Sequence, residues 1–229
     1  MKKTNINFNS IFISYEELNQ LDPYEILTLA TIRYYVLSKY KNKPYEDNPI
    51  KFLDYTVVIS NNIITTLLNN NEPLQVKSKI KTKISNAFNS LLSKGLIIAM
   101  PLSKKEYQIK ANSVLISTGI EFADITNKEF LIFFNNSNIE LKTSLVNLFV
   151  YYLKLITTIN IHSKTGCTSI KKLSEKFNMS EMTIVRYNKQ LKDMNLISIK
   201  KCKCSNDSKF YHNVYCKINN SITFRSANN

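Results

Sequence analysis

The sequence has few of the residues on which nucleotide and metal chemistry depend. Its three glycines, Gly95, Gly119 and Gly166, are isolated from one another. Glycine-rich phosphate loops, dinucleotide-binding fingerprints and nucleophile elbows need closely spaced glycines, so the sequence excludes them. The two histidines, His162 and His212, are fifty positions apart, which excludes an H-E-x-x-H site and the paired-histidine site of a rolling-circle relaxase. The acidic residues show no metal-ligand spacing either, so we expect neither a catalytic site nor a cofactor.

Long hydrophobic runs are also absent. The longest candidate, Leu145 to Ile156, is interrupted by Asn147 and Lys154 and falls short of the ~20 apolar residues that a membrane span needs. The basic N-terminus has no apolar segment of the kind found in signal peptides. We therefore expect a cytoplasmic protein that makes no contact with a membrane.

Acidic residues are scarce relative to basic ones. The chain has 31 Lys and Arg against 17 Asp and Glu, which gives a formal net charge of +14. Such an excess is typical of proteins that bind a polyanion, and nucleic acid is the first candidate. The only arginines are Arg33, Arg186 and Arg225. Most of the positive charge is therefore lysine, which suits phosphate contacts better than bidentate contacts to bases.

One pattern is present twice along the chain. The helix-start signal S/T-x-x-E occurs at Ser14 and again at Thr126. Each signal is followed by a stretch with helical apolar spacing that contains a tyrosine pair. The helices expected from this spacing are Pro23 to Lys41, with Tyr34-Tyr35, and Leu141 to Thr157, with Tyr151-Tyr152. The structural interpretation of these tyrosines is that they are core residues of their helices.

The correspondence continues downstream at a separation of one hundred positions. Gly95 and Asn195 both tolerate the left-handed conformation that ends a helix. Each is followed by two apolar strands joined by a polar turn. The expected strands are Ile97 to Leu102, Glu106 to Lys110, Ile197 to Cys202 and Phe210 to Ile218.

Helices followed by a hairpin form the outline of a winged helix. We expect a mainly α protein with small β wings, of the α+β class, that contains two tandem winged helix-turn-helix domains. The expected boundaries are 1–118 for the N-terminal domain, 119–220 for the C-terminal domain and 221–229 for a flexible tail.

The second copy carries the sharper motif. Ser169 is placed to cap a short helix, and Ser180 is placed to cap a longer one after the turn Asn178-Met179-Ser180. A short helix, a tight turn and a longer helix make a helix-turn-helix arrangement, which presents its second helix to the major groove of DNA.

The run from Ser169 through Tyr187 to Asn195-Leu196-Ile197 resembles the winged-helix segment common in bacterial regulators and replication proteins. It departs from that pattern at Asn195, where glycine is commoner. The resemblance implies that the outward face of the longer helix reads DNA, with Ser180 and Thr183 reaching phosphates. An ordinary solvated helix surface is the alternative. The residues of this face are Ser180, Glu181, Met182, Thr183, Val185, Arg186 and Lys189.

The first copy has a second candidate reading face on the helix expected from Ile80 to Lys94. Lysines alternate with other residues as the chain enters this helix, and asparagine side chains are suited to the edges of adenine. A solvated lysine face is again the alternative. The outward residues are Lys79, Lys81, Thr82, Ser85, Asn86 and Asn89.

Cysteine and histidine residues gather on the expected second wing. Their spacing, C-x-C followed by H-x-x-x-C, differs from the C-x-x-C spacing of structural zinc sites and strains a tetrahedral geometry. We therefore expect no bound metal and reduced cytosolic thiols, with a zinc clip as the minor alternative. The residues of that alternative are Cys202, Cys204, His212 and Cys216.

Two winged helices in a small, basic chain without catalytic motifs resemble the initiator proteins of theta-replicating plasmids, and phage and DnaD-like replication proteins. The resemblance implies binding to double-stranded DNA at AT-rich origin repeats, to start replication of a plasmid or other mobile element. The resemblance also suggests two kinds of protein partner: a second copy of the chain in a homodimer, and host replication proteins. Three alternatives stay open: a transcriptional regulator, an accessory protein of conjugation or partition, and a protein-interaction module with its tyrosine pairs at an interface.

Overall fold

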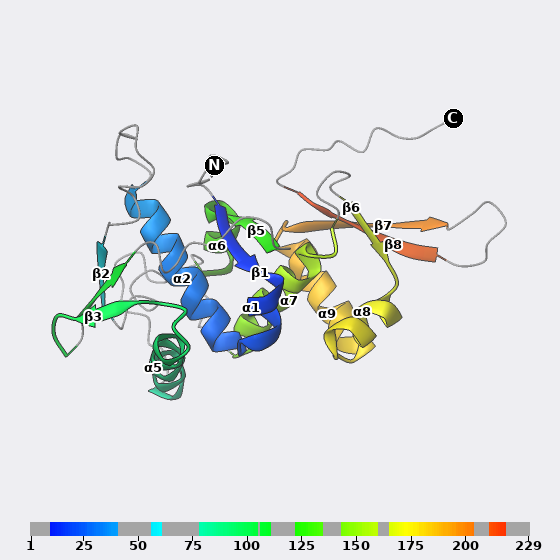
Figure 1. Cartoon of the computed structure of the whole chain (residues 1–229). Coiled ribbons are helices and arrows are strands. Elements are labelled where there is room, and N and C mark those ends of the chain that lie inside the picture. Colours follow the sequence, from blue (N-terminus) through cyan, green and yellow to red (C-terminus); the bar gives the residue numbers. More distant parts are fainter. Residues whose placement is uncertain are drawn as a thin grey trace. The chain divides into compact units, whose positions relative to one another are not determined.

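The structure is a computed structural model, and it shows a mixed α+β protein with small antiparallel sheets (Figure 1). The chain forms two compact units, Met1–Leu153 and Lys154–Asn229, which are described separately. The domain boundary expected after residue 118 stays a prediction, and the expected tail lies outside the described residues. These residues are 10–40, 56–60, 78–104, 106–110, 122–134, 143–159, 165–203 and 211–218.

The first unit contains two small sheets and the helices that pack on them. Its last helix, α7, continues three residues into the second unit. In chain order the elements are β1 (Ser10–Ser14), α1 (Tyr15–Gln20), α2 (Pro23–Tyr40), β2 (Thr56–Ser60), α5 (Ser78–Ser93), β3 (Ala99–Pro101), β4 (Glu106–Lys110), β5 (Phe122–Thr126), α6 (Asn127–Phe134) and α7 (Thr143–Ile156).

The second unit contains a helix pair and one sheet. Its elements are β6 (Thr165–Thr168), α8 (Ile170–Phe177), α9 (Glu181–Asp193), β7 (Ile197–Lys203) and β8 (Tyr211–Lys217). The helices and the two pairs of strands expected from the sequence are thus present, with ends that differ by a few residues. The sequence did not predict β1, β2 or β5.

The strands β1 and β5 pair antiparallel with each other over their full lengths. The pairing is symmetric about Phe12 and Asp124, since Ser10 lies opposite Thr126 and Ser14 opposite Phe122. Each strand leads directly into a short helix, α1 or α6. The two copies of the sequence pattern are therefore joined through equivalent strands.

Both S/T-x-x-E signals form reciprocal capping boxes, as predicted. At the start of α1, the Glu17 amide donates to Ser14 Oγ at 3.1 Å and the Ser14 amide donates to Glu17 Oε2 at 2.8 Å. At the start of α6, the Glu129 amide donates to Thr126 Oγ1 at 3.1 Å and the Thr126 amide donates to Glu129 Oε2 at 2.6 Å. Each box satisfies two backbone donors that the helix leaves without partners.

The core of the first unit is rich in aromatic rings from α6 and α7. Tyr151 and Tyr152 are fully buried, which confirms the core interpretation and rules out an interface role for this pair. Tyr152 donates a hydrogen bond of 2.7 Å to the buried carboxylate of Glu129. Tyr34 of α2 is half-buried and stacks on Phe130, with 5.1 Å between ring centroids.

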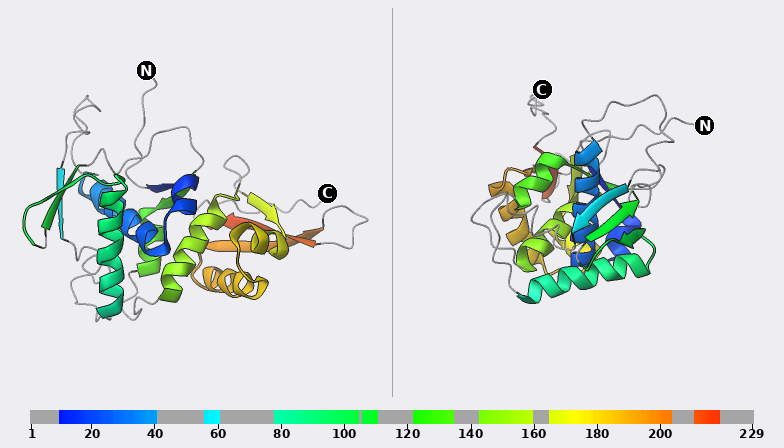
Figure 2. Two further views of the ribbon diagram at one scale, coloured as in Figure 1. Left: turned by 60° about the horizontal axis from the view of Figure 1, so that its bottom comes forward. Right: turned by 90° about the vertical axis from the view of Figure 1, so that its left-hand side faces the viewer.

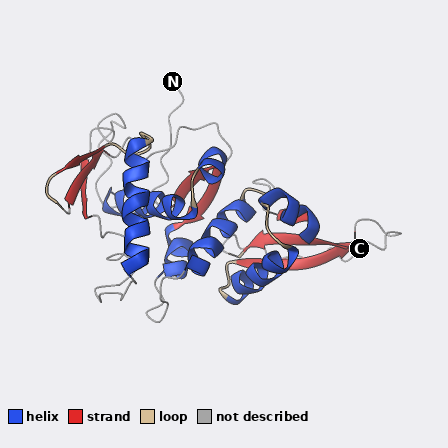
Figure 3. Ribbon diagram, turned by 90° about the horizontal axis from the view of Figure 1, so that it is seen from below, coloured by secondary structure: helices blue, strands red, loops and turns tan. Residues whose placement is uncertain are grey.

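The two three-stranded sheets share one connectivity. In the first unit the strand order is β2-β4-β3, and in the second it is β6-β8-β7. Figure 3 shows the strands of these sheets in red. In both sheets the last strand of the chain lies in the middle and pairs antiparallel with the other two. The strand that precedes the long helix, β2 or β6, therefore occupies the same place in each sheet.

Gly95 and Asn195 end α5 and α9 in the same way. Both have a left-handed backbone, with φ of 68° and 55°. The Leu96 amide donates to the Leu91 carbonyl at 3.0 Å, and the Leu196 amide donates to the Leu191 carbonyl at 3.0 Å. Glycine and asparagine adopt this conformation more readily than other residues, so the stops predicted from the sequence are confirmed.

The equivalence of the two stops predicts which substitutions Gly95 tolerates. Gly95→Asn should change the free energy of unfolding by less than about 0.5 kcal/mol, whereas Gly95→Ala should cost about 1 kcal/mol, because a Cβ strains the left-handed conformation. Among the described residues, no atom beyond Gly95 and its two chain neighbours lies within 4 Å of the Cβ position, so steric contact does not account for this cost. Urea unfolding followed by circular dichroism measures both variants, and equal losses would contradict the prediction.

In the part of the chain that the structure describes, no helix is long and apolar enough to cross a membrane.

Candidate nucleic-acid interface

The short helix, tight turn and longer helix predicted in the second copy are present in the second unit. Ser169 caps α8, where its Oγ accepts a hydrogen bond from the Lys172 amide at 3.2 Å. Asn178 then turns the chain in a left-handed conformation, with φ and ψ both 51°. Ser180 caps α9 by accepting from the Thr183 amide at 3.2 Å. Local side-chain chemistry therefore fixes where both helices begin and where the first one ends.

One side of α9 is buried within the second unit. Ile184, Tyr187 and Leu191 are at most 5% exposed. Asn188 is buried beside them and donates to the hydroxyl of Tyr215 in the central strand β8 at 3.2 Å. This polar contact, which was not predicted from the sequence, joins α9 to β8 and helps to fix the rotation of the helix.

Met194 continues the apolar spacing of this side of the helix but is only half-buried. It forms the C-cap of α9, and its amide donates to the Gln190 carbonyl at 2.9 Å. The helix ends at this point, so the side chain lies at the edge of the core.

The opposite side of α9 carries the residues proposed from the sequence to read DNA. The structure brings them together on one exposed face, except that Thr183 is half-buried. The exposed members are Ser180, Glu181, Met182, Val185, Arg186 and Lys189.

The hydroxyl groups of Ser180 and Thr183 are engaged with each other. Their oxygens lie 2.9 Å apart, and Ser180 Oγ also accepts the Thr183 amide. Their local role is thus to cap α9. The contact with phosphate expected for them stays a prediction, and it would have to compete with this hydrogen bond.

The exposed surface of the second unit is strongly basic. Among its described residues, eight exposed side chains are basic and three are acidic. A polyanion would gain from this excess and would release counterions on binding. The basic residues are Lys171, Lys172, Lys176, Arg186, Lys189, Lys192, Lys200 and Lys201, and the acidic ones are Glu175, Glu181 and Asp193.

The second candidate face, on α5, is also brought together. All six of its predicted residues are exposed, namely Lys79, Lys81, Thr82, Ser85, Asn86 and Asn89. Lys83 is half-buried and lies 4.8 Å above the ring of Tyr24. The opposite side of α5 buries Ile84, Phe88 and Leu91. The helix therefore separates apolar packing from a basic and amide-bearing surface.

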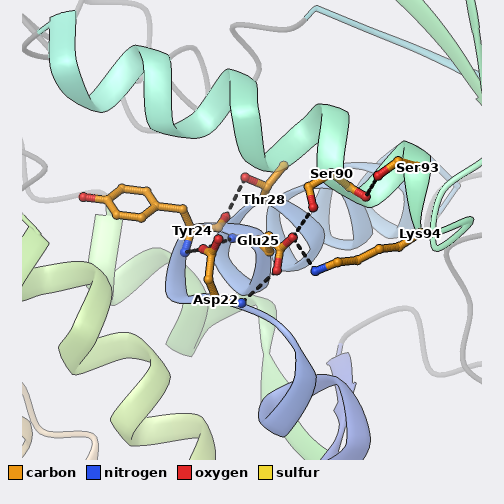
Figure 4. A network of polar contacts seen from close by, with 7 residues as sticks. All are labelled: Asp22, Tyr24, Glu25, Thr28, Ser90, Ser93 and Lys94. Carbon is orange, nitrogen blue, oxygen red and sulfur yellow. Dashed lines mark hydrogen bonds and ion pairs between the residues drawn. The ribbon is translucent and has the colours of Figure 1, made fainter.

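The helices α2 and α5 cross each other and are in contact (Figure 2). A buried carboxylate connects them. Glu25 of α2 is 3% exposed and accepts hydrogen bonds from Ser90 and from Lys94, whose Nζ lies 2.6 Å from Oε1 (Figure 4). Its other oxygen accepts the Asp22 amide at 2.8 Å. Asp22 and Glu25 form a third helix-start signal, D-x-x-E, which the sequence analysis did not use. Glu25 thus stabilises the N-terminus of α2 and contacts the C-terminal end of α5.

Two carboxylates in the first unit have lowered pKa values. Burial raises the pKa of Glu25, but hydrogen bonds from Lys94, Ser90 and Asp22 and the charge of Lys94 outweigh it. Burial likewise raises the pKa of Glu17. The hydrogen bonds and the charge of Arg33, together with the hydrogen bonds to Ser14, lower this pKa by more than burial raises it. Both groups are therefore charged in the folded protein at neutral pH.

These lowered pKa values predict loss of stability in acid. Because the unfolded chain binds protons at higher pH than the folded one, the stabilisation is complete near neutral pH and declines from about pH 5 downwards. Thermal unfolding followed by circular dichroism between pH 3 and 7 measures this. Glu25→Gln should flatten the dependence, whereas Glu106→Gln, at an exposed carboxylate, should leave it unchanged. An equal slope in all three proteins would contradict the assignment.

The described residues contain no group of three or more His, Cys, Asp or Glu side chains placed to hold a metal ion. The strand register places Cys202 opposite His212, whereas Cys216 is buried opposite Ser198, four positions away along the strand. Cys204 lies outside the described residues. The zinc alternative as a four-residue cluster is thus untested.

No model of a known protein family matches the chain, and no curated protein matches it in sequence.

Proposed function

We propose that this protein binds double-stranded DNA sequence-specifically and that each three-stranded sheet is the wing of a winged helix-turn-helix domain. The observation that carries the proposal is the exposed face of α9, where Arg186 and Lys189 lie on a helix positioned by a capped helix-turn-helix. Such a helix inserts into the major groove and contacts base edges with its outward side chains.

The first unit supports a second DNA contact of the same kind. Its α5 carries lysine and asparagine on its exposed side, and its sheet has the same strand order as that of the second unit. Two reading helices on one chain would make the second docking intramolecular, which raises the overall affinity. This arrangement suits repeated DNA sites, so we further propose that the protein initiates replication of a plasmid or other mobile element at such repeats.

Fluorescence anisotropy with duplex DNA from the gene's own locus and with a shuffled duplex, each over a range of salt, tests specific binding. We expect the locus DNA to remain bound at salt concentrations that release the shuffled DNA. Equal affinities with the same steep salt dependence would overturn the proposal and indicate a nonspecific basic protein.

Arg186→Ala should weaken binding to locus DNA by about tenfold and binding to shuffled DNA much less. Arg186→Lys keeps the charge and loses the two-pronged guanidinium contact, so it should lower specificity to a similar degree. Lys128→Ala, at an exposed lysine of α6, is the matched control and should leave the preference for locus DNA unchanged.

Permanganate reactivity of thymines beside the bound site separates initiation from regulation. An initiator should make the adjacent AT-rich duplex reactive on binding. Specific binding without any increase in reactivity would overturn the replication role and leave a DNA-binding regulator.

A further inference from the structure

Two large apolar side chains on α9 have no packing role within the second unit. Met182 is 82% exposed and Val185 is 55% exposed, whereas the apolar residues on the other side of the helix are buried. Met182 and Val185 are three positions apart and therefore lie on the same face of the helix. Ile218, after the end of β8, is the one other large apolar side chain exposed in the described part of this unit.

The charged neighbours of this pair are two cations, Arg186 and Lys189, and one carboxylate, Glu181. Arg186 follows Met182 by four positions and Lys189 follows Val185 by four, so each apolar side chain has an exposed cation one turn further along the helix. The cores of protein–protein interfaces are depleted in lysine and in charge generally. An apolar pair with more cationic than acidic neighbours, on a unit whose exposed charges are mostly basic, is instead complementary to a polyanion that also presents apolar groups.

Double-stranded DNA presents such groups in its major groove. The C5-methyl of thymine projects there, and it is contacted by apolar side chains where a helix enters the groove. The phosphates that border the groove are in reach of the lysines on the same helix. Cytosine, the other pyrimidine, has a hydrogen atom at this position and offers no methyl group.

We propose that Met182 and Val185 contact thymine C5-methyl groups and so select thymine at the bases facing the N-terminal half of α9. This inference rests on the proposed DNA binding and specifies what the α9 face reads. It assigns the apolar pair to base selection and leaves to Arg186 and Lys189 the contacts that need charge.

The test replaces thymidine by deoxyuridine in the locus duplex. This substitution removes only the C5-methyl groups and keeps base pairing. Anisotropy titrations compare both duplexes with the unaltered protein, Met182→Ala, Val185→Ala and the double variant. The unaltered protein should lose about three- to fivefold in affinity for each contacted methyl group. The double variant should bind both duplexes equally, and each single variant should show part of the loss.

Loss of folding does not explain this result, because both side chains are exposed. An unchanged circular dichroism spectrum and melting temperature verify that the variants fold. Lys192→Ala, at an exposed residue in the last turn of the same helix, is the matched control and should keep the full deoxyuridine effect. Equal binding of both duplexes by the unaltered protein, while locus DNA is still preferred to shuffled DNA, would overturn the thymine assignment alone. A deoxyuridine effect that persists in the double variant would also overturn it. No preference for locus DNA would overturn the proposed function as well.

Discussion

Glu17→Gln should destabilise the first unit by about 3 kcal/mol, since removal of one partner from a buried ion pair leaves the other charge uncompensated. Arg33 has only 6% of its side chain exposed and Glu17 only 12%. The guanidinium donates to both carboxylate oxygens, at 2.6 and 2.8 Å, and to the Phe12 carbonyl at 2.7 Å. The amide of glutamine carries no charge, and its nitrogen cannot accept a hydrogen bond in place of an oxygen.

Glu16→Gln is the matched control for this variant. Glu16 is exposed and accepts one hydrogen bond from Gln20 at 3.1 Å, so its loss should cost less than about 0.5 kcal/mol. The chain contains no tryptophan, so urea unfolding is followed by circular dichroism. Hydrogen exchange detected by mass spectrometry then assigns the loss to a unit. A similar small cost for both variants would show that the ion pair contributes little.

Gly166→Ala should destabilise the second unit by about 2 to 3 kcal/mol, because the added methyl group has no space. A Cβ at Gly166 would lie 2.6 Å from the Thr158 carbonyl oxygen and 3.2 Å from Ile159 Cα. These are backbone atoms, which cannot rotate away as a side chain can. The strand β6 would have to shift, and with it the pairing of Gly166 to Tyr215 in β8.

Cys167→Ala serves as the control for Gly166→Ala, since it changes the adjacent and exposed residue of the same strand. It should cost less than about 0.5 kcal/mol. Hydrogen exchange should report increased opening of β6 and β8 in Gly166→Ala, with the first unit unchanged. Retention of full protection in β6 would contradict the close contact with Thr158.

The effect of Gly166→Ala on the proposed DNA binding tests whether the sheet of the second unit fixes the orientation of α9. Tyr215 of β8, which pairs with Gly166, accepts the hydrogen bond from Asn188 of α9. A shift of β6 should therefore reach α9 through this contact and weaken binding to locus DNA more than binding to shuffled DNA. Equal weakening on both DNAs would indicate that the orientation of α9 does not depend on this strand.

Local signals in the sequence determined where four of the described helices begin, namely α1, α6, α8 and α9. Ser14, Thr126, Ser169 and Ser180 cap helices at the predicted positions. These contacts join residues no more than three positions apart, so the identity of a few neighbouring side chains is enough to specify them. The same is true of the exposed faces of α5 and α9, because helical periodicity alone separates their apolar residues from their polar ones.

The tertiary structure decided which of these residues acquired a second partner. Glu17 and Glu129 were recognisable as capping residues, but their contacts with Arg33 and Tyr152 join different helices. The link from Glu25 to Lys94 spans 69 positions. The pairing of β1 with β5 joins segments more than 100 positions apart. Such contacts depend on how several elements pack together. The two groups that meet in each contact lie in different elements, so no short stretch of sequence shows that their shapes and charges are complementary.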